Sequence, residues 1–257
     1  MRKSLIIIPT YNEIGNIERL IKAIFSLNNN FNILVIDDNS PDGTANAVEL
    51  IKQNYPDQLH LVKRPGKMGL GTAYISGFKW AIERGYKFVF EMDADFSHDP
   101  ASIPLLQKAC EKPDTDLAIG SRYVSGVNVV NWPLGRILMS YFASAYVRLI
   151  TGMNIKDTTA GFKCYKIDVL KSIDLDKITF KGYAFQIEMK FAVWKLGYNI
   201  VEIPIIFTER KHGTSKMSGG IFNEALWGVI IMKLKSYFQS YRYTDTYQKR
   251  KKISTRE

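Results

Sequence analysis

An alternation of short apolar runs and helical patterns is the feature of this sequence that most constrains its fold. Five runs, each bounded by polar turns, have the composition of buried strands: residues 5–8, 33–36, 59–62, 88–92 and 117–119. Helical patterns lie between them, at 14–25, from Thr44, near 72–84 and near 102–110. This order predicts an α/β protein with a mostly parallel, doubly wound sheet flanked by helices, whose ligands bind at the carboxyl ends of the strands.

The second half of the chain has a different pattern. Residues 131–151 contain no acid, and apolar residues recur on one helical face at positions 134, 137, 138, 141, 142, 145, 146, 149 and 150. We expect further elements in the form of a helix at 184–196, a strand at 205–208 and an apolar helix at 221–241. The chain is therefore divided into a main domain at 1–220, an apolar helix at 221–241 and a basic, disordered tail at 242–257.

Charge and composition narrow the choice of partners. The net charge of the 257-residue chain is +10, which suggests nucleic acid, anionic lipid or a phosphorylated substrate as partner. No nucleic-acid recognition motif accompanies the charge, so we expect no nucleic-acid partner. The longest uncharged runs fall well short of the ~20 apolar residues of a membrane-spanning helix, so an integral protein is not expected. Cys110 and Cys164 form no metal-type spacing and are predicted to be buried thiols in a reducing compartment.

The sharpest chemical feature is the pair Asp93 and Asp95, which directly follows the strand predicted at 88–92. Carboxylates at positions i and i+2 of an extended or turning segment can both reach one hard cation, and Mg²⁺ or Mn²⁺ bound this way bridges to phosphate oxygens. The alternative interpretation is a solvated acidic loop, with Asp99 before Pro100 as a turn or helix cap. The position at the ligand-binding edge of the sheet favours a metal site.

Two other loops reach the same edge. The strand at 5–8 is expected to end at Pro9 and to deliver Tyr11, which can pack on a nucleobase, and Glu13, which can accept hydrogen bonds from base N–H groups. The alternative, compatible with the first, is a helix start capped by Asn12. After the second strand, Asp38 is placed to accept hydrogen bonds from a nucleotide, although a turn rich in Asn and Asp before a capped helix would also explain this loop.

Eight motifs, in this order and spacing, resemble the inverting GT-A glycosyltransferases and, more closely, the dolichyl- and polyprenyl-phosphate mannose synthases. They are PTYNE (9–13), DDNSPDGT (37–44), GLGTAY (69–74), MDADFSHDP (92–100), GSRY (120–123), DTTAGFKCYK (157–166), KGYAFQIEM (181–189) and ERKHGTSKM (209–217). The resemblance implies a Rossmann-like GT-A fold for the main domain, which would then be the catalytic domain. It also implies amphipathic helices on the acceptor side in the second half.

The resemblance implies a set of site residues. The positions that match the binding site for the guanosine of GDP-mannose are Pro9, Tyr11, Glu13, Ile36 and Asp38. The positions that match the metal site are Asp93 and Asp95, with the Ala94 backbone near the nucleotide. The basic positions that match contacts to donor and acceptor phosphates, and that form the expected catalytic set with Asp95, are Arg122, Arg210 and Lys216. Some members have a glutamine as a further metal ligand where this chain has Ser97, whose hydroxyl is a weaker ligand that a water molecule can replace.

The implied reaction is transfer of mannose from GDP-mannose to a polyprenyl (dolichyl-type) monophosphate, with inversion. The second pKa of such an acceptor is about 6, so it is largely ionised at neutral pH and needs no general base. His98 and His212 are accordingly expected to be structural or to contact phosphate. The alternatives are a polyprenyl-phosphate glucosyltransferase that uses UDP-glucose and a non-catalytic subunit that binds nucleotide or lipid phosphate.

The expected location is peripheral, on the cytoplasmic face of a membrane. The apolar face of residues 134–150 and the helix from 221 are the candidate membrane-binding surfaces, with a membrane-anchoring subunit as a further candidate partner. The alternative for both helices is ordinary packing against the core.

Overall fold

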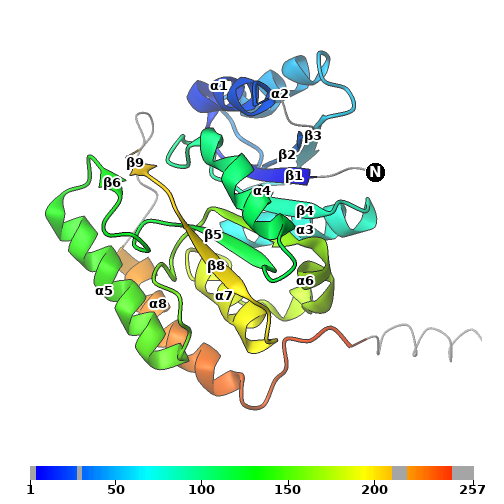
Figure 1. Ribbon diagram of the computed structural model, residues 1–257. Coiled ribbons are helices and arrows are strands. Elements are labelled where there is room, and N and C mark those ends of the chain that lie inside the picture. Colours follow the sequence, from blue (N-terminus) through cyan, green and yellow to red (C-terminus); the bar gives the residue numbers. More distant parts are fainter. Residues whose placement is uncertain (1–3, 28–30, 210–218, 245–257) are drawn as a thin grey trace, which may run out of the picture.

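A computed structural model of the chain describes residues 4–27, 31–209 and 219–244. Its centre is a seven-stranded sheet in the order β3-β2-β1-β4-β7-β5-β8, with a small sheet of β6 and β9 beside it (Figure 1). The strands are β1 (Ser4–Thr10), β2 (Phe31–Asp37), β3 (Leu59–Lys63), β4 (Phe88–Glu91), β5 (Leu117–Ser121), β6 (Val129–Val130), β7 (Lys163–Lys166), β8 (Ile200–Pro204) and β9 (Phe207–Thr208). All neighbours in the large sheet are parallel except β7, which is antiparallel to β4 and β5.

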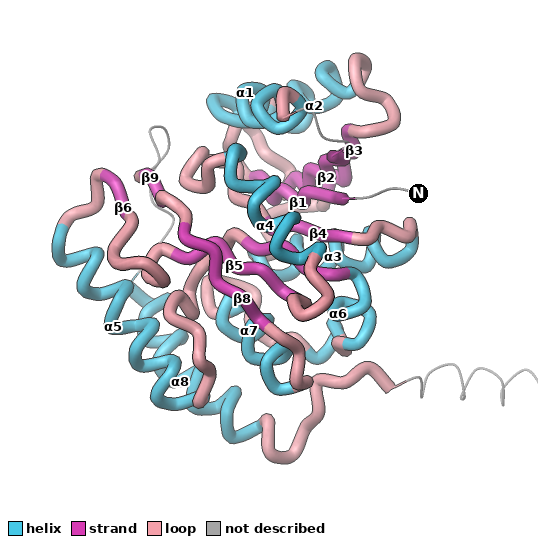
Figure 2. The backbone as a smooth tube through the Cα atoms, in the orientation of Figure 1, coloured by secondary structure: helices cyan, strands magenta, loops and turns pink. Residues whose placement is uncertain are grey.

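Helices cover both faces of this sheet (Figure 2). They are α1 (Ile14–Phe25), α2 (Thr44–Lys52), α3 (Leu70–Glu83), α4 (Ile103–Glu111), α5 (Leu134–Thr151), α6 (Ile167–Ser172), α7 (Phe185–Lys195) and α8 (Gly219–Lys235), with short 3-10 turns at Pro100–Ser102 and Leu175–Lys177. Side chains of β1 alternate between two buried clusters: Leu5 and Ile7 join the cluster of α3, α6 and α7, while Ile6 and Ile8 join that of α1, α2 and α4. The predicted mostly parallel α/β sheet with helices on both faces is confirmed.

Two strand predictions need correction, and one strand was not predicted. The first strand does not end at Pro9 but continues to Thr10. β4 pairs with β1 only as far as Ile7, so β1 has one free edge beyond that residue. Proline is tolerated at such an edge. The strand expected at 205–208 is displaced: β8 is Ile200–Pro204, and only Phe207–Thr208 of the expected segment is a strand. The antiparallel strand β7 was not predicted, because two of its four residues are lysines.

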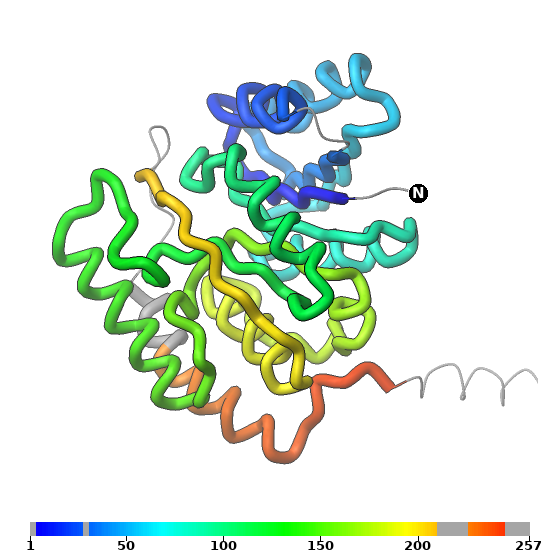
Figure 3. The backbone as a smooth tube through the Cα atoms, viewed as in Figure 1, coloured from blue at the N-terminus to red at the C-terminus, as the bar shows by residue number. Residues whose placement is uncertain are grey.

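Helices α5 and α8 lie side by side, outside the layer formed by α7 (Figure 3). The Tyr146 hydroxyl on α5 donates a hydrogen bond to the Leu226 carbonyl on α8 at 2.8 Å. The final helix spans 219–235, shorter at its end than the predicted 221–241, and 245–257 of the predicted tail lies outside the described residues. No helix in the described part of the chain is long and apolar enough to cross a membrane. Cys110 and Cys164 are both buried free thiols, as predicted.

Candidate active site at the carboxyl edge of the sheet

Asp93 lies just beyond β4, in a loop whose backbone is fixed by His98. The Asp93 backbone N–H donates to His98 Nδ1 at 3.1 Å, and the Tyr74 hydroxyl of α3 donates to Asp93 Oδ1 at 3.3 Å. Burial raises the pKa of Asp93; His98 and the Tyr74 hydroxyl oppose this rise, whereas the nearby carboxylates of Asp95 and Glu91 add to it. His98 is itself buried and stacks on Phe162. His98 was expected to be structural or to contact phosphate, and these contacts show the structural role.

Asp95 is held by Ser97. The Ser97 hydroxyl donates to Asp95 Oδ1 at 2.6 Å and the Ser97 backbone N–H donates to the same oxygen at 3.1 Å, and both side chains are buried. The three residues of the predicted metal set therefore lie in one short loop. In the described part of the chain no group of three or more His, Cys, Asp or Glu side chains could hold a metal. The donor set fits an ion that keeps few protein ligands and completes its shell with water and substrate phosphate, as Mg²⁺ does.

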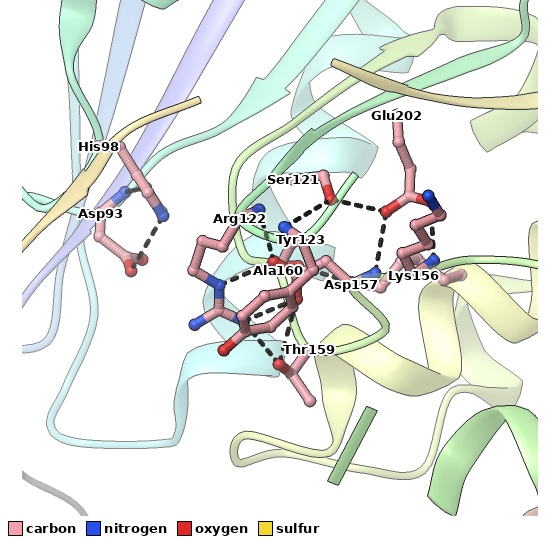
Figure 4. Close-up of polar contacts among 11 residues, drawn as sticks. Asp93, His98, Ser121, Arg122, Tyr123, Lys156, Asp157, Thr159, Ala160 and Glu202 are labelled. Atoms are coloured by element: carbon pink, nitrogen blue, oxygen red, sulfur yellow. Dashed lines mark hydrogen bonds and ion pairs between the residues drawn. The ribbon is translucent and has the colours of Figure 1, made fainter. Parts of the chain in front are cut away.

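Arg122 follows β5 and is clamped by Asp157 (Figure 4). Arg122 Nε donates to Asp157 Oδ2 at 2.7 Å, and the NH2 nitrogen donates to Asp157 Oδ1 at 2.6 Å and to Thr159 Oγ1 at 2.7 Å. Although burial alone would raise the pKa of Asp157, its attraction to Arg122 and the hydrogen bonds from that residue lower the pKa overall. Arg122 also lines the cavity described below, and its contact with a phosphate stays a prediction. Part of the positive charge of Arg122 is balanced by Asp157.

The residues predicted to hold a nucleoside lie at the ends of β1 and β2. Asp38 is buried, and Arg64 Nε donates to its Oδ1 at 2.5 Å while the Met68 backbone N–H donates to its Oδ2 at 3.2 Å. Lys67 lies over the Tyr11 ring, 5.1 Å from its centroid. Arg64 and Lys67 were missed by sequence reasoning, because nothing in their local pattern indicates their long-range contacts.

Other members of this nucleoside set have more local roles. Glu13 accepts a hydrogen bond from the Asn16 side chain at 3.0 Å, and Glu13, not Asn12, is the residue at the start of α1. Ile36 is fully buried within β2, between β1 and β3, so its predicted contact with a nucleoside stays a prediction. Pro9 is inside β1, and the expected closeness of Pro9 and the Ala94 backbone to a nucleotide stays a prediction. Arg210, His212 and Lys216 lie outside the described residues.

A buried polar network that was not predicted lies behind Asp93. Lys163 of β7 is fully buried, and its Nζ lies 3.1 Å from Glu91 Oε1 and donates to Gln186 Oε1 on α7. The Tyr165 hydroxyl donates to Glu91 at 2.7 Å. Burial lowers the pKa of Lys163, although Glu91 opposes the shift. The sequence feature that could have indicated this network is the pair of lysines in KCYK. Lysine is rarely fully buried in a central strand unless it has a partner.

A cavity of about 850 Å³ extends from Asp93, Asp95 and Arg122 to the α5–α8 pair. Polar side chains line one end: Asp93, Asp95, Ser97, Arg122, Thr159 and Gln186. Apolar side chains line the other: Met139, Phe142, Ala143, Tyr146 and Val147 of α5, Ile187 of α7 and Leu226 of α8. A molecule with a phosphorylated head and a long apolar chain suits such a cavity.

Comparisons with known proteins agree with this geometry. The chain matches the family model for glycosyl transferase family 2 over residues 5–174. An undecaprenyl-phosphate mannosyltransferase of Micrococcus luteus is 46% identical over 230 residues, which covers 88% of this chain and 93% of that protein. A polyprenol monophosphomannose synthase of Mycolicibacterium smegmatis is 43% identical over 233 residues, covering 89% of this chain and 88% of the relative.

Solved structures share the fold at lower identity. A Mycobacterium tuberculosis glucosyl-3-phosphoglycerate synthase, in complex with Mn²⁺, UDP-glucose and phosphoglyceric acid, has a TM-score of 0.65 at 17% identity and covers 91% of this chain and 79% of its own. A mannosyltransferase from Pyrobaculum calidifontis, in complex with GDP-Man and Mn²⁺, has a TM-score of 0.58 at 18% identity and covers 94% of this chain and 66% of its own. The predicted GT-A fold is confirmed.

Proposed function

We propose that this chain, which belongs to glycosyl transferase family 2, transfers mannose from GDP-mannose to a polyprenyl (dolichyl-type) monophosphate with inversion at the anomeric carbon. The observation that carries this proposal is the single cavity that runs from Asp93 and Asp95 to an apolar wall of α5 and α8. A donor diphosphate suits the carboxylate end through a cation, and a prenyl chain suits the apolar end. Both named relatives are mannosyltransferases or phosphomannose synthases of prenyl phosphates.

Asp93 and Asp95 are the residues that would hold Mg²⁺ or Mn²⁺, with Ser97 orienting Asp95 and with its hydroxyl or a water as a further ligand. When bound, such a cation neutralises negative charge on the departing diphosphate. Pro9, Tyr11, Glu13, Ile36 and Asp38 are the residues proposed to hold the nucleoside, with the Ala94 backbone near the nucleotide. Arg122, Arg210 and Lys216 complete the proposed phosphate contacts.

The chain's own residues position the reactants and do not need to remove a proton. A phosphate monoester is largely dianionic at neutral pH and is already a nucleophile. His98, which lines the cavity, is occupied at Nδ1 by the Asp93 backbone and is buried against Phe162, so it is poorly placed to act as a base. Catalysis then rests on alignment of acceptor and donor and on charge stabilisation.

The proposed membrane-binding surface consists of exposed apolar side chains on the two neighbouring helices. On α5 these are Leu134, Leu138, Phe142 and Leu149. On α8 they are Trp227, Ile231 and Leu234, and Phe238 follows shortly after the helix ends. Leu149 and Phe238 are 82% and 94% exposed. Such a surface suits peripheral attachment to the cytoplasmic face of a membrane, where anionic lipids attract a chain of net charge +10. A membrane-anchoring subunit covering the same surface is the other proposed means of attachment.

The decisive experiment is a transfer assay with purified protein, Mg²⁺ or Mn²⁺ and a polyprenyl phosphate, comparing labelled GDP-mannose with labelled UDP-glucose. Formation of polyprenyl-phosphate mannose from GDP-mannose is expected, with β configuration at the new linkage. Preferential transfer from UDP-glucose would replace the mannosyl assignment with a glucosyl one. Binding of nucleotide and lipid phosphate without transfer from either donor would indicate a non-catalytic binding subunit and overturn the proposal.

A further inference from the structure

We propose that the side-chain amide of Gln186 binds the acceptor, by donating a hydrogen bond from Nε2 to an oxygen of the lipid phosphate. This inference rests on the proposed function and adds a residue to its acceptor site. Gln186 is the second residue of α7, is only 2% exposed, and lines the cavity between the aspartates and the apolar wall.

The orientation of the Gln186 amide is set by Lys163. A lysine ammonium group has three N–H donors and no acceptor, so the amide atom that faces Lys163 Nζ must be the oxygen, Oε1. Lys163 is itself held in the core by Glu91, 3.1 Å away. The usual ambiguity between the oxygen and nitrogen of a glutamine amide is therefore resolved by its partner. Nε2 is directed away from Lys163.

Gln186 Nε2 is buried and has no hydrogen-bond partner among the described residues. A buried donor without a hydrogen bond is costly to the folded protein, so such groups usually meet a partner in a bound state. The amide is also polarised, because its oxygen accepts from an ammonium group, and this strengthens the N–H as a donor. A negatively charged oxygen is the acceptor that gains most from such a donor.

Gly161 locates the space that Nε2 faces. A Cβ atom built on Gly161 would lie 3.7 Å from Gln186 Nε2 and 3.7 Å from Asp93 Oδ2, and 3.4 Å from His98 Cε1. The lack of a side chain at 161 therefore keeps open a small space between the amide and the Asp93 carboxylate. Gly161, Gln186 and Asp93 all line the cavity that also has residues of α5 in its wall.

The position favours the acceptor phosphate as the ligand. The neighbouring residue on α7, Ile187, lines the same cavity together with Tyr146 and Val147 of α5, so Gln186 lies where the polar end meets the apolar wall. A prenyl chain lying along that wall must place its phosphate at this junction to approach the donor over Asp93. An amide does not ionise, so it can bind a dianionic nucleophile without a change in its own charge. The pH dependence of acceptor binding would then depend on the ionisation of the acceptor itself.

The test uses Gln186→Glu in the full chain. The substitution keeps the shape and an oxygen for Lys163 but replaces the donor Nε2 by an acceptor oxygen, which repels phosphate. Gln53→Glu, an exposed site after α2, is the matched control. Binding of farnesyl phosphate, a short prenyl monophosphate, is measured calorimetrically with Mn²⁺ and GDP present. Transfer to farnesyl phosphate and hydrolysis of GDP-mannose without acceptor are measured in parallel.

For Gln186→Glu we expect farnesyl phosphate binding and the kcat/KM of transfer to fall by about 10- to 100-fold or more, the range for a lost hydrogen bond to a charged group. Acceptor-free hydrolysis, measured at saturating Mn²⁺ and GDP-mannose so that the added carboxylate near Asp93 cannot act through Mn²⁺ affinity, should stay within about twofold, and Gln53→Glu should match the wild type. Unchanged farnesyl phosphate binding overturns the proposal. If hydrolysis and donor KM change while farnesyl phosphate binding does not, the amide contacts the donor sugar and the proposal is equally overturned.

If Gln186→Glu does not fold, as judged by circular dichroism, Gln186→Ala replaces it in every measurement with the same expectations. Failure of the proposed function would be distinct: the wild-type chain itself would then transfer no mannose from GDP-mannose to farnesyl phosphate. The binding comparison does not depend on the sugar, so it still decides whether Gln186 contacts a phosphate monoester.

Discussion

The Ser97 hydroxyl donates to Asp95 Oδ1 at 2.6 Å, and the backbone N–H of Ser97 donates to the same oxygen. Both side chains are almost completely buried. One Asp95 oxygen is therefore held by Ser97, which fixes the orientation of the carboxylate at the proposed cation site. We therefore expect Ser97 to act on the proposed metal site through Asp95, even if a water takes the ligand position that the resemblance assigns to residue 97.

Ser97→Ala should lower Mn²⁺ affinity about 10- to 100-fold, the usual effect of removing a group that orients a metal ligand. The dissociation constant for Mn²⁺ is measured by calorimetry in the presence of GDP, with Ser125→Ala, an exposed serine, as the control. Transfer at saturating Mn²⁺ should recover most of the wild-type rate, since the alanine leaves the Asp95 carboxylate in place. Wild-type Mn²⁺ affinity in Ser97→Ala would show that Asp95 needs no such support.

Asp93→Asn and Asp95→Asn should each abolish transfer while leaving the fold intact, because they remove a negative charge but little volume. The measurement is transfer activity across a Mn²⁺ and Mg²⁺ titration, with the circular dichroism spectrum as a check of folding. Asp114→Asn, at an exposed position, serves as the control for loss of one carboxylate. Wild-type activity in excess EDTA would contradict the metal assignment.

Asp157→Asn should reduce the free energy of unfolding by about 3–5 kcal/mol at pH 7, because it leaves Arg122 buried without its counter-charge. The folded pKa of Asp157 is below the ordinary value of 3.8, since Arg122 and its hydrogen bonds outweigh the effect of burial. A lowered pKa means that this stabilisation is complete above about pH 4 and is lost as the pH falls through the folded value.

The difference in unfolding free energy between wild type and Asp157→Asn should therefore be constant from pH 7 to about pH 4 and narrow below that. Urea unfolding at a series of pH values measures it, with Asp114→Asn to correct for loss of an exposed carboxylate. A difference that is constant down to pH 2.5 would mean that Asp157 is not held as an ion pair with Arg122.

The sequence predicted those parts of the fold that depend on local pattern. The strands β1 and β2 are buried on both faces, so their runs of isoleucine and valine were readable directly. β7 was not predicted, because the burial of Lys163 depends on its ion pair with Glu91, 72 residues earlier in the chain. β8 is half-buried at the edge of the sheet and has no continuous apolar run.

The candidate site divides in the same way. Asp93 and Asp95 were found because they directly follow a strand, and parallel strands bring their carboxyl ends to one edge. Gln186 and Lys163 were missed because the contact between them joins a helix to a strand 23 residues earlier. Tertiary packing created that contact, and no spacing rule indicates it.

Membrane attachment is tested best on residues that are exposed but do not line the cavity. Tyr146, an obvious target from the sequence, is unsuitable because its hydroxyl joins α5 to α8, and Phe142 lines the cavity. Leu138 and Leu149 are exposed on α5 and are absent from the cavity wall. We expect Leu138→Ser with Leu149→Ser to weaken binding to anionic liposomes about 10- to 100-fold, since burying one leucine side chain contributes about 1.5–3 kcal/mol and these two would be buried only in part.

The matched control is Leu50→Ser with Leu105→Ser, two exposed leucines on α2 and α4. This control should bind liposomes as the wild type does, and in both proteins the binding should weaken at high salt because the lipid headgroups attract a basic chain. The α5 variant should keep transfer to farnesyl phosphate but lose transfer to long-chain acceptors in vesicles. If liposome binding by the α5 variant is unchanged, α5 does not face the membrane. The next candidate surface is then α8 with the residues just after it, and Trp227→Ser with Phe238→Ser is the corresponding test.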